Sequence, residues 1–275
     1  MTPQELFSLI KDTQDYNLHS HTEFCDGHAT LSEMAGAAAE AGMKVWAATP
    51  HSPICVESKC NMSKDSVPAF LEQCEAARER YDGTMRFLTS MEIDFINRDF
   101  GPHIDYFQRL PLDFRLGSVH FVPNQEGIWL DCDGRFERFA EYLRYGFNGD
   151  LRYVVEKYFE QVLAMLELGG IDMLGHFDKI IGNAAMADAT IESQGWYEAL
   201  VDDVVTHASA SGVVVEINTK AFHDKGRFFP HSRWWDKLKD AEVPVAVNSD
   251  AHYPEKVNLG RREALSLWNK QKPLH

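Results

Sequence analysis

The sequence predicts an α/β fold, and more specifically a single-domain (β/α)7 barrel over residues 1–275. Short apolar or β-branched runs alternate along the chain with segments that have helical spacing. Continuous apolar strands of this kind indicate a parallel sheet covered by helices. Seven such units close into a barrel more readily than they lie open. The predicted strands are residues 16–19, 45–50, 85–93, 114–119, 171–175, 213–217 and 243–247.

Four intervening segments have the pattern of amphipathic helices. Residues 30–41 open with Thr30 and Glu33 in capping-box positions, and they end at Gly42. Longer helices are predicted over residues 65–81, 151–168 and 193–211, and each of them ends near a glycine or a strand start. The segments 97–112 and 123–149 fit neither pattern clearly, so no element is assigned to them.

Composition and charge narrow the class of protein. Hydrophobic residues make up 44% of the 275 positions and charged residues 25%, which is ordinary for a globular protein. A net charge of −15 argues against a nucleic-acid-binding surface, because phosphate contacts need clustered Lys and Arg. A small phosphorylated substrate remains compatible with this charge, because bound divalent metals reverse the local sign.

Cysteine usage and hydropathy favour a cytoplasmic protein without membrane association. The five cysteines are odd in number and form no Cys-x-x-Cys motif, so we expect reduced thiols rather than disulfides or a Cys-based zinc site. No stretch approaches the roughly 18 apolar residues of a membrane span. The first residues include an early Glu and lack an apolar core of signal-peptide length. The sequence leaves the oligomeric state open.

Metal-ligand residue types gather at the ends of the predicted strands. Because the carboxyl ends of the strands in a parallel barrel share one rim, residues far apart in sequence should converge there. A single histidine in such a place is more often a hydrogen-bonded rim or core residue. Eight such groups buried together without a metal would cost several kcal/mol. The eight residues at six strand ends are His19, His21, His51, Glu92, His120, His176, Asp250 and His252.

The spacing within two of these strand ends suits metal binding. Residues i and i+2 of a strand point the same way, so His19 and His21 can grip one ion, and Asp250 and His252 repeat the arrangement. His-x-His alone is a weak motif and depends on this context. Imidazole with carboxylate suits zinc, iron or manganese, whereas a calcium site uses oxygen ligands almost throughout.

In these residues the chain resembles the PHP (polymerase and histidinol phosphatase) family. Within the family it looks most like the histidinol-phosphate phosphatase branch, through Gly-Ser-Val-His-Phe, Gly-His-Phe-Asp and Glu-Ile-Asn. The matching motifs run in family order between residues 17 and 252. They are His19-Ser-His21-Thr-Glu-Phe-Cys-Asp26-Gly, Thr49-Pro-His51-Ser, Met91-Glu92-Ile-Asp, Gly117-Ser-Val-His120-Phe, Gly175-His176-Phe-Asp, Glu216-Ile-Asn and Asn248-Ser-Asp250-Ala-His252.

The resemblance implies a distorted (β/α)7 barrel that holds up to three divalent metal ions (Zn, Mn or Fe). It also implies catalytic roles for Glu92, Asp250 and His252. Asp26 fits the family spacing, while His28 is an alternative ligand at the same place. The implied ligand sets are His19, His21, Glu92 and Asp250 for one metal, Glu92 as a bridge with His120 and His176 for a second, and Asp26, His51 and His252 for a third.

Adjacent divalent ions suit phosphate monoester hydrolysis by direct attack of activated water. The chain has no Cys-x5-Arg phosphatase loop, so we expect no covalent phosphoenzyme. The resemblance implies conversion of L-histidinol phosphate to L-histidinol and phosphate, a step of histidine biosynthesis. Two alternatives stay open: a phosphoesterase for a nucleotide, sugar phosphate, phosphoprotein or nucleic-acid end, and a metal-binding scaffold without catalysis.

Four residues near the predicted rim are candidates for substrate binding. Lys220 and Arg227 would contact the phosphate, although most Lys and Arg are simply solvated. Glu216 or Asp178 would neutralise a substrate ammonium, or would equally well orient a ligating histidine. His223 and His231, in the loop that carries Lys220, are candidate proton donors, with solvated loop histidines as the alternative.

Overall fold

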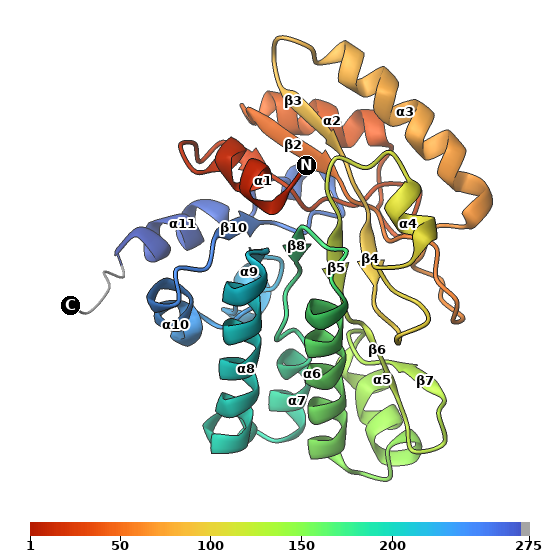
Figure 1. Cartoon of the computed structure of the whole chain (residues 1–275), viewed down its shortest axis with the longest axis vertical. Helices are drawn as coiled ribbons and strands as arrows, with labels where there is room; N and C mark the ends of the chain where they lie inside the picture. Colours follow the sequence, from red (N-terminus) through yellow and green to blue (C-terminus); the bar gives the residue numbers. More distant parts are fainter. Residues whose placement is uncertain (271–275) are drawn as a thin grey trace.

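The computed structural model describes residues 1–270 and shows parallel strands wrapped by helices (Figure 1). Residues 271–275 of the predicted domain lie outside the described residues. Every predicted apolar run contains a strand, and the run 85–93 is divided into β3 and β4. The strands are β1 (Tyr16–Asn17), β2 (Val45–Ala48), β3 (Arg86–Thr89), β4 (Glu92–Asp94), β5 (Leu116–Ser118), β6 (Phe121–Pro123), β7 (Trp129–Asp131), β8 (Met173–Leu174), β9 (Val214–Asn218) and β10 (Val245–Asn248).

Parallel pairing closes the strands into an irregular barrel. One sheet has the order β1-β2-β3, and the other has the order β10-β9-β8-β5-β4. An isolated parallel bridge between His51 and Glu92 joins the two sheets on one side. On the other side a bridge between Ser20 and Ala251 joins the segments that follow β1 and β10. The predicted distorted (β/α)7 barrel is therefore confirmed, with β3 and β4 counting as one broken strand.

The four predicted helices are present with small shifts at their ends. The capping box at Thr30 and Glu33 forms as expected. No helix within residues 1–270 is long and apolar enough to cross a membrane. The α-helices are α1 (Pro3–Ile10), α2 (Leu31–Glu40), α3 (Val67–Arg80), α4 (Asp105–Arg109), α5 (Phe136–Glu141), α6 (Leu151–Leu168), α7 (Ile181–Ala187), α8 (Gly195–Ser211), α9 (Phe222–Lys225), α10 (Trp235–Asp240) and α11 (Arg261–Lys270).

The two segments without a sequence assignment form short elements beside the rim. Residues 97–112 contain only the short helix α4. Residues 123–149 contain most of the antiparallel β6–β7 hairpin, α5 and a π-helical turn over Tyr142–Gly146. Single short turns and a hairpin lack a long periodic pattern, which is why the sequence did not resolve them.

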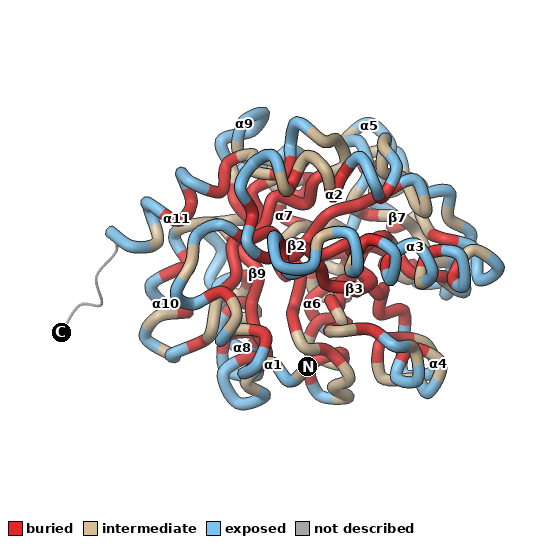
Figure 2. The backbone as a smooth tube through the Cα atoms, turned by 90° about the horizontal axis from the view of Figure 1, so that it is seen from above, coloured by how far each residue is buried: buried red, intermediate tan, exposed pale blue. Residues whose placement is uncertain are grey.

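Apolar side chains fill both the barrel and its outer layers. At the amino ends of the strands, Leu6 and Ile10 of α1 close the interior against Leu18, Leu88 and Met173. Outside the barrel, α6 and α8 pack on one part of the sheet, and α2 and α3 pack on β2 and β3. Figure 2 shows the buried strands in the middle and the exposed outer turns of the helices around them. Polar residues lie at the carboxyl ends of the strands instead.

Candidate metal centre

All eight polar residues predicted at the strand ends lie together at the carboxyl rim. The bridges between Ser20 and Ala251 and between His51 and Glu92 bring the ends of four strands into contact at this point. Asp250 has a backbone φ of 50°, a left-handed conformation that is uncommon for a residue other than glycine. Strained backbone of this kind clusters at functional sites, where the surrounding structure holds it in place.

Glu92 lies at the middle of the cluster, with its side chain 1% exposed. Its two oxygens face imidazole nitrogens from five histidines. The distances from Glu92 Oε2 are 3.1 Å to His51 Nδ1, 3.2 Å to His19 Nε2 and 3.4 Å to His21 Nε2, and those from Oε1 are 2.8 Å to His176 Nε2 and 3.4 Å to His120 Nε2. Although burial opposes ionisation, these histidines hold the pKa of Glu92 well below its usual value. An ionised carboxylate in this position can bridge two cations.

Three groups of side chains have ligand atoms within 4.8 Å of one another. They agree with the sets implied by the family resemblance in most members. One difference is that His21 and His51 each take part in two groups. Glu92 belongs to a single group and not to that of His19, His21 and Asp250, and His176 contacts Glu92 without belonging to a group. The groups are His21, Asp26, His51 and His252; His19, His21 and Asp250; and His51, Glu92 and His120.

The structure places Asp26, and not His28, among the candidate ligands. Asp26 Oδ1 lies 3.4 Å from His252 Nε2 and 3.8 Å from His51 Nε2. The ring of His28 instead stacks on Tyr253, with 4.3 Å between the ring centroids. The tight loop that holds Asp26 requires Gly27, because a Cβ atom there would lie 2.4 Å from the backbone nitrogen of Thr22.

Buried carboxylates orient two of the histidines from outside the cluster. Glu216 Oε1 accepts a hydrogen bond from His19 Nδ1 at 2.7 Å, and Asp94 Oδ1 lies 2.6 Å from His120 Nδ1. Both contacts leave the Nε2 atom of the ring facing the cluster, as in metal sites with carboxylate-supported histidines. Against the opposing effect of burial, Asp94 and Glu92 raise the pKa of His120 to about 9. Glu216 therefore lies where an orienting role, the second of its two predicted roles, would place it.

The donor set fits divalent metal ions. Burial lowers the pKa values of His21 and His51, which favours the neutral rings that bind a metal. His120, whose pKa is raised, would release its proton when a metal ion binds. Four buried side-chain atoms of the candidate ligands have no hydrogen-bond partner within the described residues: Asp26 Oδ1, His51 Nδ1, His120 Nε2 and His176 Nδ1. Asp26 and His120 belong to different groups of ligand residues, and His51 belongs to both. Unpaired buried polar atoms are costly, and cations bound in these two groups would offset that cost.

A cleft beside the cluster is lined by candidate ligands and by two lysines. Its volume is about 160 Å³, and a second cavity of about 230 Å³ adjoins it through Asp133, Lys179 and Lys220. Lys220 Nζ lies 3.3 Å from Asp250 Oδ1 and 3.2 Å from His252 Nε2, with 42% of its side chain exposed. Lys220 is therefore placed where the sequence predicted a phosphate contact.

Arg227 and Asp178 are not brought to this cleft. Arg227 forms a bidentate ion pair with Glu192. Asp178 accepts a hydrogen bond from the backbone nitrogen of His231 at 3.0 Å, and burial raises its pKa to about 7. These contacts tie the loop after β9 to the segments around it, so a substrate-binding role for the two residues has no geometric support. His231 Nδ1 likewise accepts from the backbone of Arg233.

Sequence reasoning missed Lys179 and Asp133. Lys179 directly follows the Gly-His-Phe-Asp motif, and Asp133 belongs to an Asp-Cys-Asp segment that begins at the last residue of β7. Their ion pair, at 2.8 Å, joins the β8–α7 connection to the hairpin. The i, i+2 spacing of Asp131 and Asp133 could have indicated this segment, but no local sequence pattern indicates that Lys179 is the partner of Asp133.

The barrel and its rim define a class of site: a buried cluster of histidines and carboxylates around Glu92 whose ligand atoms could hold divalent metal ions. The model of the PHP domain family matches residues 17–220. The chain therefore belongs to the PHP domain family. A search of curated protein sequences gave no match.

Several solved structures share the fold at low sequence identity. A Listeria monocytogenes protein assigned as the histidinol phosphatase hisK superposes with a TM-score of 0.80 at 18% identity, covering 90% of this chain and 99% of the other. Histidinol phosphate phosphatase from Lactococcus lactis gives 0.70 at 18% identity, covering 94% and 93%. A chain in the structure of archaeal ribonuclease P with mature tRNA gives 0.51 at 16% identity, covering 94% and 83%.

Proposed function

We propose that the protein is a metal-dependent phosphate monoesterase and that its substrate is L-histidinol phosphate. The observation that carries the proposal is the convergence of the nine predicted ligand residues, Glu92 among them, in one buried cluster. Two lysines, Lys179 and Lys220, line the same cleft. A site that combines clustered cation ligands with additional positive groups is built to bind and polarise a phosphoryl group.

The three groups of ligand atoms would hold up to three divalent ions, with zinc, manganese and iron as the candidates. Bound there, such ions supply Lewis-acid charge to the phosphoryl oxygens and lower the pKa of an attacking water. The protein's own contribution is to fix the geometry. Glu216 and Asp94 hold His19 and His120 in one orientation, while Glu92 and Asp250 remain ionised.

The two adjoining cavities suit an amino-alcohol phosphate. The cavity of about 160 Å³ is lined by candidate ligands and has room for a phosphoryl group, and the adjoining cavity of about 230 Å³ is lined by Asp224 and Phe229. A carboxylate there would pair with a substrate ammonium, and an aromatic ring would pack on an imidazole. The related Lactococcus lactis enzyme was solved with zinc, L-histidinol and phosphate. Its fold is shared by this chain, which supports the same class of substrate.

A panel of phosphate esters tests the proposal. Metal-reconstituted protein should hydrolyse histidinol phosphate with a kcat/KM more than about tenfold above that for a nucleoside monophosphate, a sugar phosphate and a phosphopeptide, a margin of about 1.4 kcal/mol at the transition state. The matched variants are His120→Ala and His207→Ala, because His207 is an exposed histidine on α8. Only the first should lose activity.

The other outcomes point to the alternatives. Comparable turnover of several esters would indicate a phosphoesterase of different specificity on the same metal site. Metal binding without turnover of any ester would indicate a scaffold and would refute the enzymatic proposal. A long nucleic acid is disfavoured as substrate by the net charge of −15.

A further inference from the structure

Lys179 is an unusual lysine, because its side chain is only 11% exposed. It lies between β8 and α7, immediately after the segment that carries His176. Its ammonium contacts two carboxylates: Asp133 Oδ2 at 2.8 Å and Asp250 Oδ2 at 3.6 Å. Lysine is almost never this buried unless it is paired, so these contacts account for its being tolerated there.

The ammonium of Lys179 is a fixed positive charge. Its two carboxylate partners, Asp133 and Asp250, compensate the charge of the buried nitrogen. A group of this kind serves poorly as a proton donor and well as a permanent electrostatic partner for an anion.

The ammonium also retains hydrogen-bonding capacity toward the cleft. It has three N–H donors, and of its two carboxylate contacts only that to Asp133 is within hydrogen-bond length. Lys179 lines both adjoining cavities, together with Asp133 and Lys220. A purely structural ion pair would not need to open onto the cleft that borders the candidate metal ligands.

We propose that Lys179 Nζ binds a non-bridging oxygen of the substrate phosphoryl group and that Asp133 is the residue that positions it. This inference rests on the proposed function as a phosphate monoesterase. In the reaction a water oxygen bonds to phosphorus and releases one proton to solvent, the ester P–O bond breaks, and the leaving alkoxide takes a proton from solvent. Lys179 keeps its own proton and stabilises the negative charge on the phosphoryl oxygens.

The test compares Lys179→Met and Lys179→Arg with the control Lys157→Met, since Lys157 forms an exposed ion pair with Glu160 on α6. Lys179→Met should weaken competitive inhibition by inorganic phosphate at least about tenfold and lower kcat/KM by about 10²–10³-fold, as for loss of one preorganised donor. The loss should be equal for p-nitrophenyl phosphate, whose leaving group needs no proton, and for an alkyl phosphate. Lys179→Arg should recover at least about tenfold, because the charge is kept.

Positioning by Asp133 has its own readout. Asp133→Asn should lower kcat/KM by about 10–100-fold, the usual effect of replacing a residue that holds a binding group in place. It should weaken inhibition by inorganic phosphate by the same factor. In the double variant with Lys179→Met, the effect of Asp133→Asn should largely disappear, because both changes act through one ammonium. Additive losses would contradict the positioning role.

Three results would overturn the inference. They are unchanged phosphate inhibition in Lys179→Met, a loss confined to the alkyl ester, and loss of bound metal in Lys179→Met but not in Lys157→Met. If Lys179→Met does not fold, Lys179→Gln takes its place, since an amide can still donate to Asp133. If the wild type hydrolyses no ester, the proposed function fails, whereas calorimetric binding of inorganic phosphate to the metal-loaded protein still tests Lys179 separately.

Discussion

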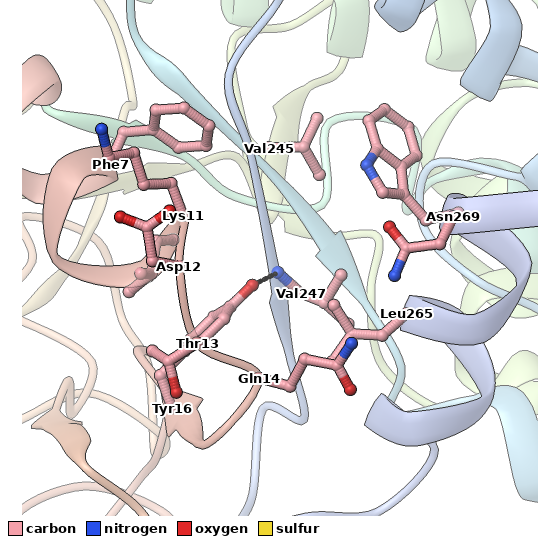
Figure 3. Close-up of a pocket in the computed structure, with 12 residues that line it drawn as sticks. Phe7, Lys11, Asp12, Thr13, Gln14, Tyr16, Val245, Val247, Leu265 and Asn269 are labelled. Atoms are coloured by element: carbon pink, nitrogen blue, oxygen red, sulfur yellow. Dashed lines mark hydrogen bonds between the residues drawn. The ribbon is translucent and has the colours of Figure 1, made fainter. Parts of the chain in front are cut away.

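The two ends of the barrel are built from the same strands but carry different residues, polar at the carboxyl ends and apolar at the amino ends. At the carboxyl ends, buried histidines and carboxylates face one another around Glu92. At the amino ends, Leu6 and Ile10 of α1 seal an apolar interior. A cavity of about 320 Å³ lies beside α1 and α11 at this second end, and Figure 3 shows Phe7, Tyr16 and Val247 in its wall.

The comparison shows that cavity size does not locate the function. The cavity at the amino end is larger than the cleft of about 160 Å³ at the rim. Polar residues such as Lys11, Asp12 and Gln14 line it, and Tyr16 Oη accepts a hydrogen bond from the backbone nitrogen of Val247 at 2.8 Å. None of the described residues that line it belongs to a group of ligand atoms that could hold a metal ion. The rim cleft instead is lined by candidate ligands, and some of their buried atoms have no hydrogen-bond partner. We therefore expect catalysis at the rim, and we expect the residues at the amino end to contribute to folding stability.

The largest effect should come from Glu92→Gln. The amide keeps the shape but removes the charge that would bridge two cations, so activity should fall by at least about 10³-fold, or about 4 kcal/mol at the transition state. Bound metal, measured by elemental analysis, should fall as well. The control at the opposite end is Glu5→Gln in the capping box of α1. Full activity in Glu92→Gln would show that this residue does not bridge.

The second largest effect should come from Leu6→Ala, which should lower the folding stability. Leu6 is fully buried, and truncation in a packed core typically costs about 2–5 kcal/mol of unfolding free energy. Denaturant titration should show this loss, while metal content and kcat per folded molecule stay at wild-type values. A reduced kcat at full folding would mean that the two ends are coupled rather than separate.

A smaller effect is expected from Asp94→Asn, which weakens the support of His120. Metal affinity and kcat/KM should each drop by about 10–100-fold, the usual range for a contact behind a ligand. Asp172→Asn is the matched change at the base of β8, where Asp172 accepts from the backbone nitrogen of Arg115 at 2.8 Å. That variant should retain metal affinity. Equal metal loss in both would contradict a local role for Asp94.

Much of the candidate site could be predicted because its residues sit at strand ends. An apolar run followed by His19 and His21, or by Asp250 and His252, marks both the strand and its carboxyl end. In a parallel barrel the carboxyl ends of all strands lie at one common rim. The capping box at Thr30 was equally local and formed as expected. Short elements in residues 97–112 and 123–149 had no such periodic signal.

The positions of long charged side chains could not be predicted from the sequence and required the tertiary structure. Arg227 was expected at the phosphate, but Glu192, far away in sequence, holds it elsewhere. Lys179 gave no signal, because its burial depends on Asp133 from a hairpin that folds over it.

The sequence by itself determined the barrel and the identity of the residues at its rim, because strand periodicity and parallel topology are enough to bring them to one place. Only the tertiary structure decided that Asp26 faces the other ligands while His28 stacks on Tyr253. It alone also decided how the donors are grouped and which cations flank them. These outcomes depend on distances of a few ångströms between segments that are remote in the chain, and no local pattern encodes them.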